Sequence, residues 1–209
     1  MILALSKTKI FFYNFNFNLL MKVESRKQEI INAASILFKE KGYSAVTMRD
    51  LAKAMGIKAA SLYNHIQSKQ EILSTIIISL AEEFTYGMNQ IVASDENTTQ
   101  KLENIIDLHI DVTLRNADGL ASLNNDWMHL EEDNLIYFEK MREDYEENFR
   151  EIIKNGVEKN EIKPFNIEIM VFSTLSTLRT LYLWYPKQKD IDADILKKDM
   201  VSVLLKGVV

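Results

Sequence analysis

Residues that end or bend helices are scarce in this sequence. The 209 residues include 6 glycines and 2 prolines, Pro164 and Pro186. Folds built from many short strands need turn residues at close intervals, so the scarcity of glycine and proline favours long helices. With 47% hydrophobic and 26% charged residues, the chain can bury one sizeable core or two small ones. We therefore predict an all-α protein with one small domain and one larger domain.

The lack of cysteine excludes several kinds of chemistry. A chain with no cysteine has no disulfide framework, no thiolate zinc site and no cysteine nucleophile. No apolar run approaches the roughly 18 to 20 residues that a membrane-spanning helix needs. We therefore expect a soluble protein of the reducing cytoplasm that has no contact with a membrane.

An enzyme or a metal site finds little support in the residue pattern. The three histidines, His65, His109 and His129, are dispersed, and the sequence has no glycine-rich phosphate loop, HExxH or G-x-S-x-G pattern. The acids at 131–133 follow His129 and could suggest metal ligands, but a solvated helix end explains them better. We predict no catalytic residue, no cofactor and no metal site.

The net charge of −5 is distributed unevenly along the chain. Residues 22–73 contain 9 Lys and Arg against 5 acids, a balance of +4, whereas residues 74–209 contain 14 against 25, a balance of −11. A basic segment joined to an acidic remainder is typical of a module that meets phosphate at one end. A solvated surface would give the same pattern, so the charge alone decides nothing.

Three short helices joined by tight turns are predicted in the N-terminal third of the chain. The first ends at Gly42, because glycine can take the left-handed conformation that closes a helix. The second starts at Thr47, where Asp50 completes a relative of the capping box, and it ends at Gly56. The third covers residues 59–65. Two short helices joined by a glycine turn form a helix-turn-helix, whose second helix can lie in the major groove of DNA.

The same segment resembles the tetracycline-repressor (TetR) family of bacterial transcriptional regulators. The resemblance covers residues 24–73 without a gap and rests on Ile30-Ile31-Asn32-Ala33-Ala34, Leu37-Phe38, Gly42-Tyr43, Thr47-Met48-Arg49-Asp50-Leu51-Ala52, Gly56-Ile57, Leu62-Tyr63-Asn64-His65 and Ser68-Lys69-Gln70-Glu71-Ile72-Leu73. It implies an N-terminal helix-turn-helix domain that grips operator DNA and a C-terminal helical domain that binds a ligand and dimerises. We place these domains at residues 22–68 and 69–209, after an extension over residues 1–21.

The resemblance implies two groups of DNA contacts. Phosphate or positioning contacts are expected from Thr47, Tyr63, His65 and Lys69. Contacts that read base edges are expected from Arg49, Lys58, Ala59, Ala60, Ser61 and Asn64. The family often has Ser or Thr at position 58 and Gly at position 60, so Lys58 and Ala60 leave the start of the helix and the operator sequence open. A packed core aromatic is the alternative interpretation of Tyr63.

Apolar spacing beyond residue 68 predicts six more helices. They cover residues 69–93, 99–117, 119–131, 134–160, 166–185 and 192–207. The last two carry more apolar surface than one subunit needs for its own core. The family resemblance implies that they pair with their copies in a homodimer, whose two-fold symmetry matches a palindromic operator.

Large, adaptable apolar side chains are common in the second domain, as in ligand pockets. On the family resemblance, the ligand-binding candidates are Phe84, Met88, His109, Trp127, Met128, Leu130, Met141, Tyr145, Met170, Leu175, Leu178 and Tyr182. Each of them could instead be an ordinary core residue.

A further resemblance bears on the effector. The stretch Met141-Arg142-Glu143-Asp144-Tyr145 through Gly156, Glu161 and Pro164 to Leu181-Tyr182-Leu183-Trp184-Tyr185-Pro186 is similar to TetR regulators of fatty-acid or steroid breakdown that respond to acyl-CoA thioesters. It implies a small hydrophobic effector, either an acyl-CoA or a fatty acid, with a hydrophobic drug or planar aromatic molecule as the alternative. The effector would favour a conformer whose recognition helices no longer match successive major grooves, which relieves repression. The rival hypothesis is a helical structural or interaction protein that binds no DNA.

Residues 1–20 differ in character from the rest of the chain. From Phe11, aromatic and apolar residues alternate with asparagines, a strand pattern with no second strand nearby. Met21 directly precedes the point at which helical patterning begins. We expect translation to start at Met21, and an arm that contacts DNA or bridges the dimer is the alternative. Asparagines interrupt the apolar run and no cleavage site follows, so a secretory signal is not supported.

Overall fold

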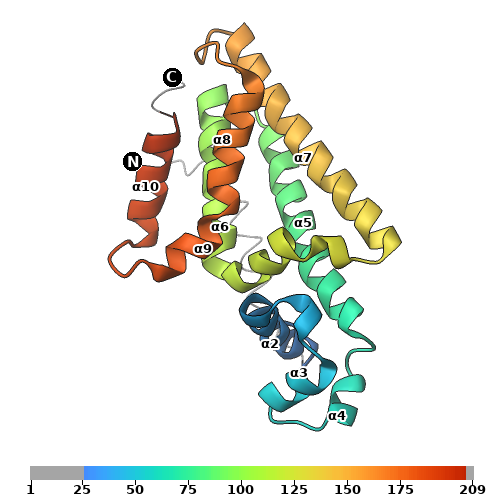
Figure 1. Ribbon diagram of the computed structural model, residues 1–209. Coiled ribbons are helices and arrows are strands. Elements are labelled where there is room, and N and C mark those ends of the chain that lie inside the picture. The colour runs from blue at the N-terminus through green and yellow to red at the C-terminus, as the bar shows by residue number, and fades with distance from the viewer. Residues whose placement is uncertain (1–25, 206–209) are drawn as a thin grey trace, which may run out of the picture.

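The computed structural model describes residues 26–205, and the regular structure in this range is entirely helical (Figure 1). The predicted all-α class is therefore confirmed. The elements in chain order are α2 (Arg26–Lys41), η1 (Tyr43–Ala45), α3 (Met48–Ala54), α4 (Ala59–Tyr63), α5 (Lys69–Ala93), α6 (Thr98–Asn125), η2 (Trp127–His129), α7 (Glu132–Glu158), α8 (Ile167–Arg179), α9 (Leu181–Trp184), η3 (Tyr185–Lys187) and α10 (Ala193–Leu205). The expected start at Met21 lies outside the described residues. None of the described helices combines the length and hydropathy that a membrane span requires.

The helix-turn-helix unit α2 to α4 lies at the lower end of the molecule in Figure 1. The predicted capping box starts α3: the Thr47 hydroxyl accepts the Asp50 N–H at 3.2 Å, and the Asp50 carboxylate accepts the Thr47 N–H at 2.9 Å. Gly42 (φ 79°) ends α2 and Gly56 (φ 66°) makes the turn before α4. Both turns need a backbone conformation that side chains disfavour, which explains glycine at these two positions.

The larger domain is built around α5, α6 and α7, which pack side by side. The helix α5 begins beside the helix-turn-helix and runs up into the larger domain, so one continuous helix connects the two domains (Figure 1). The helix α2 packs against α6, and this contact docks the small unit on the large one. The helices α8 and α10 pack against α6 with one face each, and their other faces stay exposed.

Two predicted helix boundaries differ from the structure because side chains bind the backbone. Residues 98–125 form one element, in which Asn116 departs from helical geometry (φ −148°, ψ 51°) and its Oδ1 accepts the Gly119 N–H at 3.0 Å. The break predicted between residues 117 and 119 is therefore a kink within α6, and the helix predicted to reach residue 131 ends at Asn125.

The helix predicted over residues 166–185 is interrupted in the structure. It ends at Arg179 and resumes as the short α9, with Thr180 between them. The Thr180 hydroxyl donates to the backbone oxygens of Ser176 (2.9 Å) and Thr177 (3.1 Å). Such local hydrogen bonds bend or end helices, and apolar spacing does not reveal them.

Candidate DNA-reading helix and effector pocket

The predicted recognition helix α4 is held by one apolar side chain of its own and one from the segment that follows it. Leu62 (0% exposed) and Ile66 (1% exposed) enter the core of the small domain, as their positions in the pattern predict. Lys58 occupies the N-cap of α4 and makes no side-chain cap bond. The departure from the family pattern at this position therefore leaves a helix that starts at Ala59 without a capping hydroxyl.

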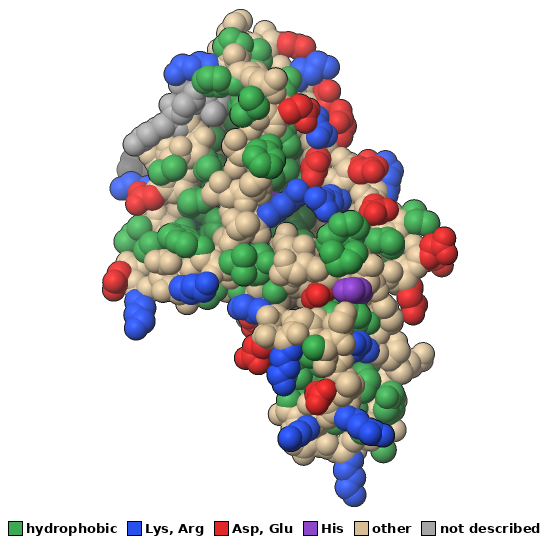
Figure 2. Space-filling model, viewed as in Figure 1, with side chains coloured by type: hydrophobic (Ala, Val, Ile, Leu, Met, Phe, Trp, Pro, Cys, Tyr) green, Lys and Arg blue, Asp and Glu red, His purple; other side chains and the backbone are tan. Residues whose placement is uncertain are grey.

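The other face of α4 and the start of α3 are open to solvent. Eight of the ten predicted DNA contacts are exposed, and Ala59 and Lys69 are half-buried. Tyr63 is 53% exposed, so its alternative interpretation as a packed core aromatic is wrong. Figure 2 shows Lys and Arg side chains projecting from this end of the molecule. The arrangement presents small side chains, charge and an aromatic hydroxyl on one accessible surface.

Lys69 lies at the start of α5, and its ammonium group turns inward. The Nζ atom donates to the backbone oxygens of Tyr43 and Val46, both at 2.9 Å, and lies 4.1 Å from the centre of the Tyr43 ring. Burial lowers the pKa of the Lys69 ammonium group. Lys69 therefore connects α5 to the turn that leads into α3. This agrees with the prediction of Lys69 as a positioning residue more than with the alternative of a phosphate contact.

The 3-10 turn η2 joins the small domain to the large one. The His129 ring stacks on Tyr43 at 5.4 Å between centroids, and its Nε2 lies 3.4 Å from the Ser44 hydroxyl. The Gln70 side-chain amide donates to the His129 backbone oxygen at 2.5 Å. At the other end of the turn, Trp127 lines the pocket described next. The turn η2 thus contacts the pocket through its first residue, Trp127, and the helix-turn-helix domain through its last residue, His129.

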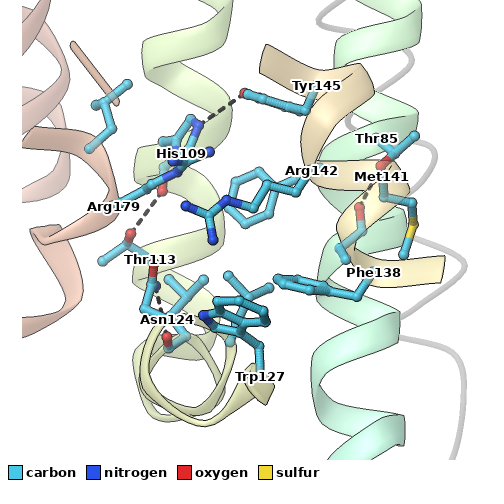
Figure 3. Close-up of a pocket in the computed structure, with 15 residues that line it drawn as sticks. Thr85, His109, Thr113, Asn124, Trp127, Phe138, Met141, Arg142, Tyr145 and Arg179 are labelled. Carbon is cyan, nitrogen blue, oxygen red and sulfur yellow. Dashed lines mark hydrogen bonds between the residues drawn. The ribbon is translucent and has the colours of Figure 1, made fainter. Parts of the chain in front are cut away.

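A pocket of about 310 Å³ lies among α5, α6, α7 and the end of α8 (Figure 3). It is lined by Ala81, Phe84, Thr85, His109, Thr113, Leu120, Leu123, Asn124, Trp127, Phe138, Met141, Arg142, Tyr145, Leu178 and Arg179. Its volume lies at the lower end of the range for small-molecule sites, and its mixture of an apolar wall with a few polar groups is typical of them.

One polar pair is buried in the pocket wall. The His109 Nε2 lies 2.9 Å from the Tyr145 hydroxyl, and both residues are almost fully buried (Figure 3). Burial, together with the nearby Arg179 charge, lowers the pKa of His109 to about 3. Burial also raises the pKa of the Tyr145 hydroxyl. Both groups are therefore neutral at physiological pH and offer hydrogen bonds without charge.

Six of the predicted ligand-binding residues line this pocket: Phe84, His109, Trp127, Met141, Tyr145 and Leu178. The other six do not line it: Met88, Met128, Leu130, Met170, Leu175 and Tyr182. Met88 is 0% exposed in the core, and Leu175 and Tyr182 also belong to the core. Met128 is 51% exposed on the outside of η2. Residue type alone does not distinguish a core residue from a pocket residue, so the sequence could not separate these six residues from the six that line the pocket.

The polar part of the pocket was missed by the sequence interpretation. This part consists of Thr85, Thr113, Asn124, Arg142 and Arg179. The prediction rested on large apolar side chains and therefore did not include these residues. The spacing of 138, 141, 142 and 145 on α7 could have indicated a shared face, because residues three and four apart are neighbours on a helix. The metal interpretation of residues 129–133 gains no support, since the described residues contain no cluster of metal ligands.

A further surface is apolar and exposed. Phe172 (72%) and Ile169 (64%) project from α8, and Val203 (71%) projects from α10. Large apolar side chains this exposed on two helices are a feature of interaction sites in soluble proteins. The two helices are those for which pairing was predicted.

An exposed helix-turn-helix at one end and a separate pocket among the helices of the larger domain define a class of protein, the transcriptional regulators with a separate sensor domain. Residues 30–76 match the family model of bacterial regulatory proteins of the tetR family, and residues 95–208 match that of the tetracyclin repressor-like C-terminal domain. The chain belongs to the TetR family of transcriptional regulators. It is a regulator and not an enzyme.

Known relatives agree with this placement. The transcriptional repressor KstR2 of Rhodococcus jostii is 24% identical over 184 residues, which cover 87% of this chain and 90% of the relative. Among solved structures, the ketosteroid regulator KstR2 of Mycobacterium tuberculosis superposes with a TM-score of 0.83 at 20% identity, covering 90% of this chain and 97% of the other. AibR in complex with isovaleryl coenzyme A and operator DNA gives a TM-score of 0.72 at 20% identity, with coverage of 86% and 97%.

Proposed function

We propose that this regulator is a cytoplasmic repressor that binds a palindromic operator as a homodimer and leaves it when a small hydrophobic effector enters the pocket. The observation that carries the proposal is the position of η2. Trp127 at its start lines the pocket, and His129 at its end stacks on Tyr43 in the helix-turn-helix domain. A ligand that moves the pocket wall therefore moves a contact of the DNA-binding unit.

The DNA side of the proposal divides the exposed residues by role. Tyr63, His65 and Thr47 are proposed to fix the position of the domain on the phosphate backbone. Arg49, Lys58, Ala59, Ala60, Ser61 and Asn64 are proposed to meet base edges. Phosphate contacts set the register on DNA and base contacts set the sequence specificity. Substitutions in the first group should therefore weaken binding to all sequences, whereas substitutions in the second group should change the sequence preference.

The dimer is proposed to form through α8 and α10. Their outer faces carry exposed apolar side chains, among them Phe172 and Val203, and burying such area is the usual driving force for association. Equivalent patches on two copies meet around a two-fold axis, which presents two copies of α4 on the same side. Successive half-sites of an operator lie about 34–36 Å apart, one helical turn of DNA.

The effector is proposed to be an acyl compound, either a fatty acid or an acyl-CoA thioester. AibR, which shares the fold, is described in complex with isovaleryl coenzyme A, and the pocket has an apolar wall with a few polar groups. A planar aromatic molecule is the alternative, because Trp127, Phe138 and Phe84 supply aromatic surface. A thermal-shift screen with both classes distinguishes them.

The mechanism is a shift between two populations of conformers. An effector that binds the released conformer more tightly than the operator-bound one weakens DNA binding by the ratio of the two affinities. The coupling in such systems is typically about 5- to 150-fold.

The experiment that tests the function starts from genomic DNA. Fragments that co-purify with the protein are sequenced, and the shared site is used in a gel shift at two salt concentrations. The proposal expects a symmetric site and an affinity that falls steeply with salt, because phosphate contacts release counterions. Failure to retain any DNA would favour a helical structural or interaction protein instead.

A further inference from the structure

The pocket carries positive charge on its wall and no negative charge. None of its fifteen lining residues is acidic, and two of them, Arg142 and Arg179, are arginines. His109 is buried and neutral, so it does not add to this charge. A site with two guanidinium groups and no carboxylate on its wall favours an anion over a neutral ligand.

Both arginines share one carboxylate behind the wall. The Glu146 Oε1 atom lies 2.8 Å from the Arg179 Nη2 and 3.6 Å from the Arg142 Nε. Within residues 26–205, Glu146 is the one acid in ion-pair distance of either arginine. A guanidinium group has five N–H donors. One shared carboxylate therefore leaves donors of both groups for a second anion.

A third arginine beside Glu146 serves as an internal comparison. Arg150 lies 3.7 Å from Glu146, but it also pairs with Glu168 at 2.8 Å and Glu147 at 3.3 Å. Arg150 does not line the pocket. Arg150 is therefore balanced by acids outside the pocket, whereas Arg142 and Arg179 line the pocket and share one acid.

The two pocket arginines lie between the apolar wall and solvent. The Arg142 side chain is 44% exposed and that of Arg179 is 28% exposed, while His109 and Tyr145 behind them are almost fully buried. In Figure 3 the Arg142 side chain reaches from α7 across the pocket, and its guanidinium carbon lies 5.6 Å from the Trp127 ring centre. The pocket thus combines two partly exposed charged side chains with a buried wall whose polar groups are neutral.

The size of the pocket limits the apolar part of the ligand. A cavity of about 150 Å³ holds one benzene molecule, which has six non-hydrogen atoms. The pocket has about twice that volume, 310 Å³, and therefore suits a body of roughly a dozen such atoms. A ten-carbon chain with an acidic head group has this size.

We infer that the effector is an amphipathic anion, whose apolar body fills the pocket while its anionic head binds Arg142 and Arg179 in competition with Glu146. This inference deepens the proposed effector site and rests on it. The head group is the carboxylate of a free acid, because only a charge attached directly to the apolar body reaches the two arginines that line the pocket. In a thioester the nearest negative charge lies beyond the pantetheine arm of coenzyme A, too far from the acyl chain to meet the same two guanidinium groups.

The test compares ligands that share one chain and differ in charge. Decanoate, 1-decanol, decanoyl-CoA and coenzyme A are titrated into the dimeric protein by calorimetry, with no DNA present. The expected result is a Kd for decanoate at least about tenfold below that for decanol, since hydrogen bonds to charged groups are the strong ones. Equal affinity for decanol, no binding of decanoate, or binding of decanoyl-CoA or coenzyme A but not of decanoate overturns the inference.

Three variants assign the preference to residues. The double variant Arg142→Gln, Arg179→Gln is expected to lose the preference for the anion, so that decanoate binds no more tightly than decanol. Glu146→Gln removes the competing carboxylate and is expected to strengthen anion binding severalfold, a gain that misfolding does not produce. Arg150→Gln is the matched control and should keep the wild-type preference. A preference that survives in the double variant, or an anion affinity that Glu146→Gln does not raise, contradicts the inference.

A separate gel shift on the operator keeps this test distinct from that of the proposed function. If the protein binds its operator but shows no anion preference, the regulator function stands and the inference fails. If it binds anions through the two arginines but no DNA, the proposed function fails and the ligand assignment stands.

Discussion

Burial keeps the His109 side chain uncharged in the folded protein. Its pKa is about 3 there, against an ordinary value of 6.5. The unfolded chain therefore takes up a proton below pH 6.5 that the folded chain refuses, so the free energy of unfolding falls as the pH falls from 6.5 towards 3. The loss amounts to about 1.4 kcal/mol per pH unit.

His109→Gln is predicted to remove this pH dependence while keeping a hydrogen-bond partner for Tyr145. Urea unfolding at pH 7 and pH 5 should show that the wild type loses about 2 kcal/mol more than the variant between the two values. The variant is expected to be less stable at pH 7 and to approach the wild type at pH 5. Parallel losses in both proteins would mean that His109 is already protonated in the folded state.

Lys69 is a second residue for which the structure sharpens the expectation. Because its ammonium group binds the backbone of Tyr43 and Val46, we predict that Lys69→Gln weakens binding to all operator sequences without changing the slope of affinity against salt. A residue that contacts phosphate would lower that slope by about one when it is removed. Gel shifts over a salt series measure the slope, and a drop of one unit would show a phosphate contact instead.

Variants on α4 are expected to behave differently from Lys69→Gln. Asn64→Ala should change the order of preference within a randomised operator library, because base contacts carry the sequence information. Sequencing the bound fraction gives that order. An unchanged order with a uniform loss would place Asn64 among the positioning residues.

At the scale of elements, η2 is the feature that joins the two domains. His129→Ala removes the ring that stacks on Tyr43 and leaves the pocket residue Trp127 in place. We predict that decanoate, or the thioester that binds the wild-type pocket, then weakens operator binding severalfold less than in the wild type. Fluorescence anisotropy of labelled operator at increasing ligand concentration measures this coupling.

Met128→Ala is the matched control for η2, because its side chain is 51% exposed between the two contact residues. It should keep the wild-type coupling. A His129→Ala protein that responds to the ligand as strongly as this control would show that the signal passes elsewhere, for example through the packing of α2 on α6.

The sequence predicts those elements whose cause is local. The capping box at Thr47 and the glycine turns at Gly42 and Gly56 are set by a few adjacent residues, and the structure has them where the pattern indicates. The kink at Asn116 and the break at Thr180 depend on side-chain bonds to the backbone that compete with the helix. The spacing of apolar residues does not indicate where such side-chain bonds interrupt a helix.

The pocket is harder to predict because it is a property of four helices together. Phe84 and Met88 lie one turn apart on α5, yet Phe84 lines the pocket and Met88 is in the core. Arg142 lies in a run of charged residues and Arg179 in an otherwise uncharged stretch, and only the packing of α7 on α8 brings both to the pocket. A sequence pattern reports which face of a helix is apolar, but not what stands opposite that face.

At the scale of the whole molecule, the proposed function depends on association of two copies. Phe172 is 72% exposed in one protomer, so Phe172→Glu disturbs no internal packing and is predicted to give a folded monomer. Light scattering at micromolar concentration measures the mass, and operator affinity should fall at least tenfold because one protomer reaches one half-site. Ile136→Glu on α7, where the side chain is 59% exposed, should stay dimeric. A dimeric Phe172→Glu protein would place the interface elsewhere.

The lack of cysteine in this chain allows the most direct test of the account, a distance between two identical spin labels. A single cysteine at Gln67, an exposed position just after α4, labels each protomer once, and pulsed electron resonance measures the separation in the dimer. We predict one narrow distribution on the operator, set by half-sites about 34–36 Å apart, and a displaced distribution when the ligand fills the pocket. A distance that is absent, or one that is the same with operator and with ligand, would contradict a two-fold regulator whose pocket controls the placement of its DNA-reading helices.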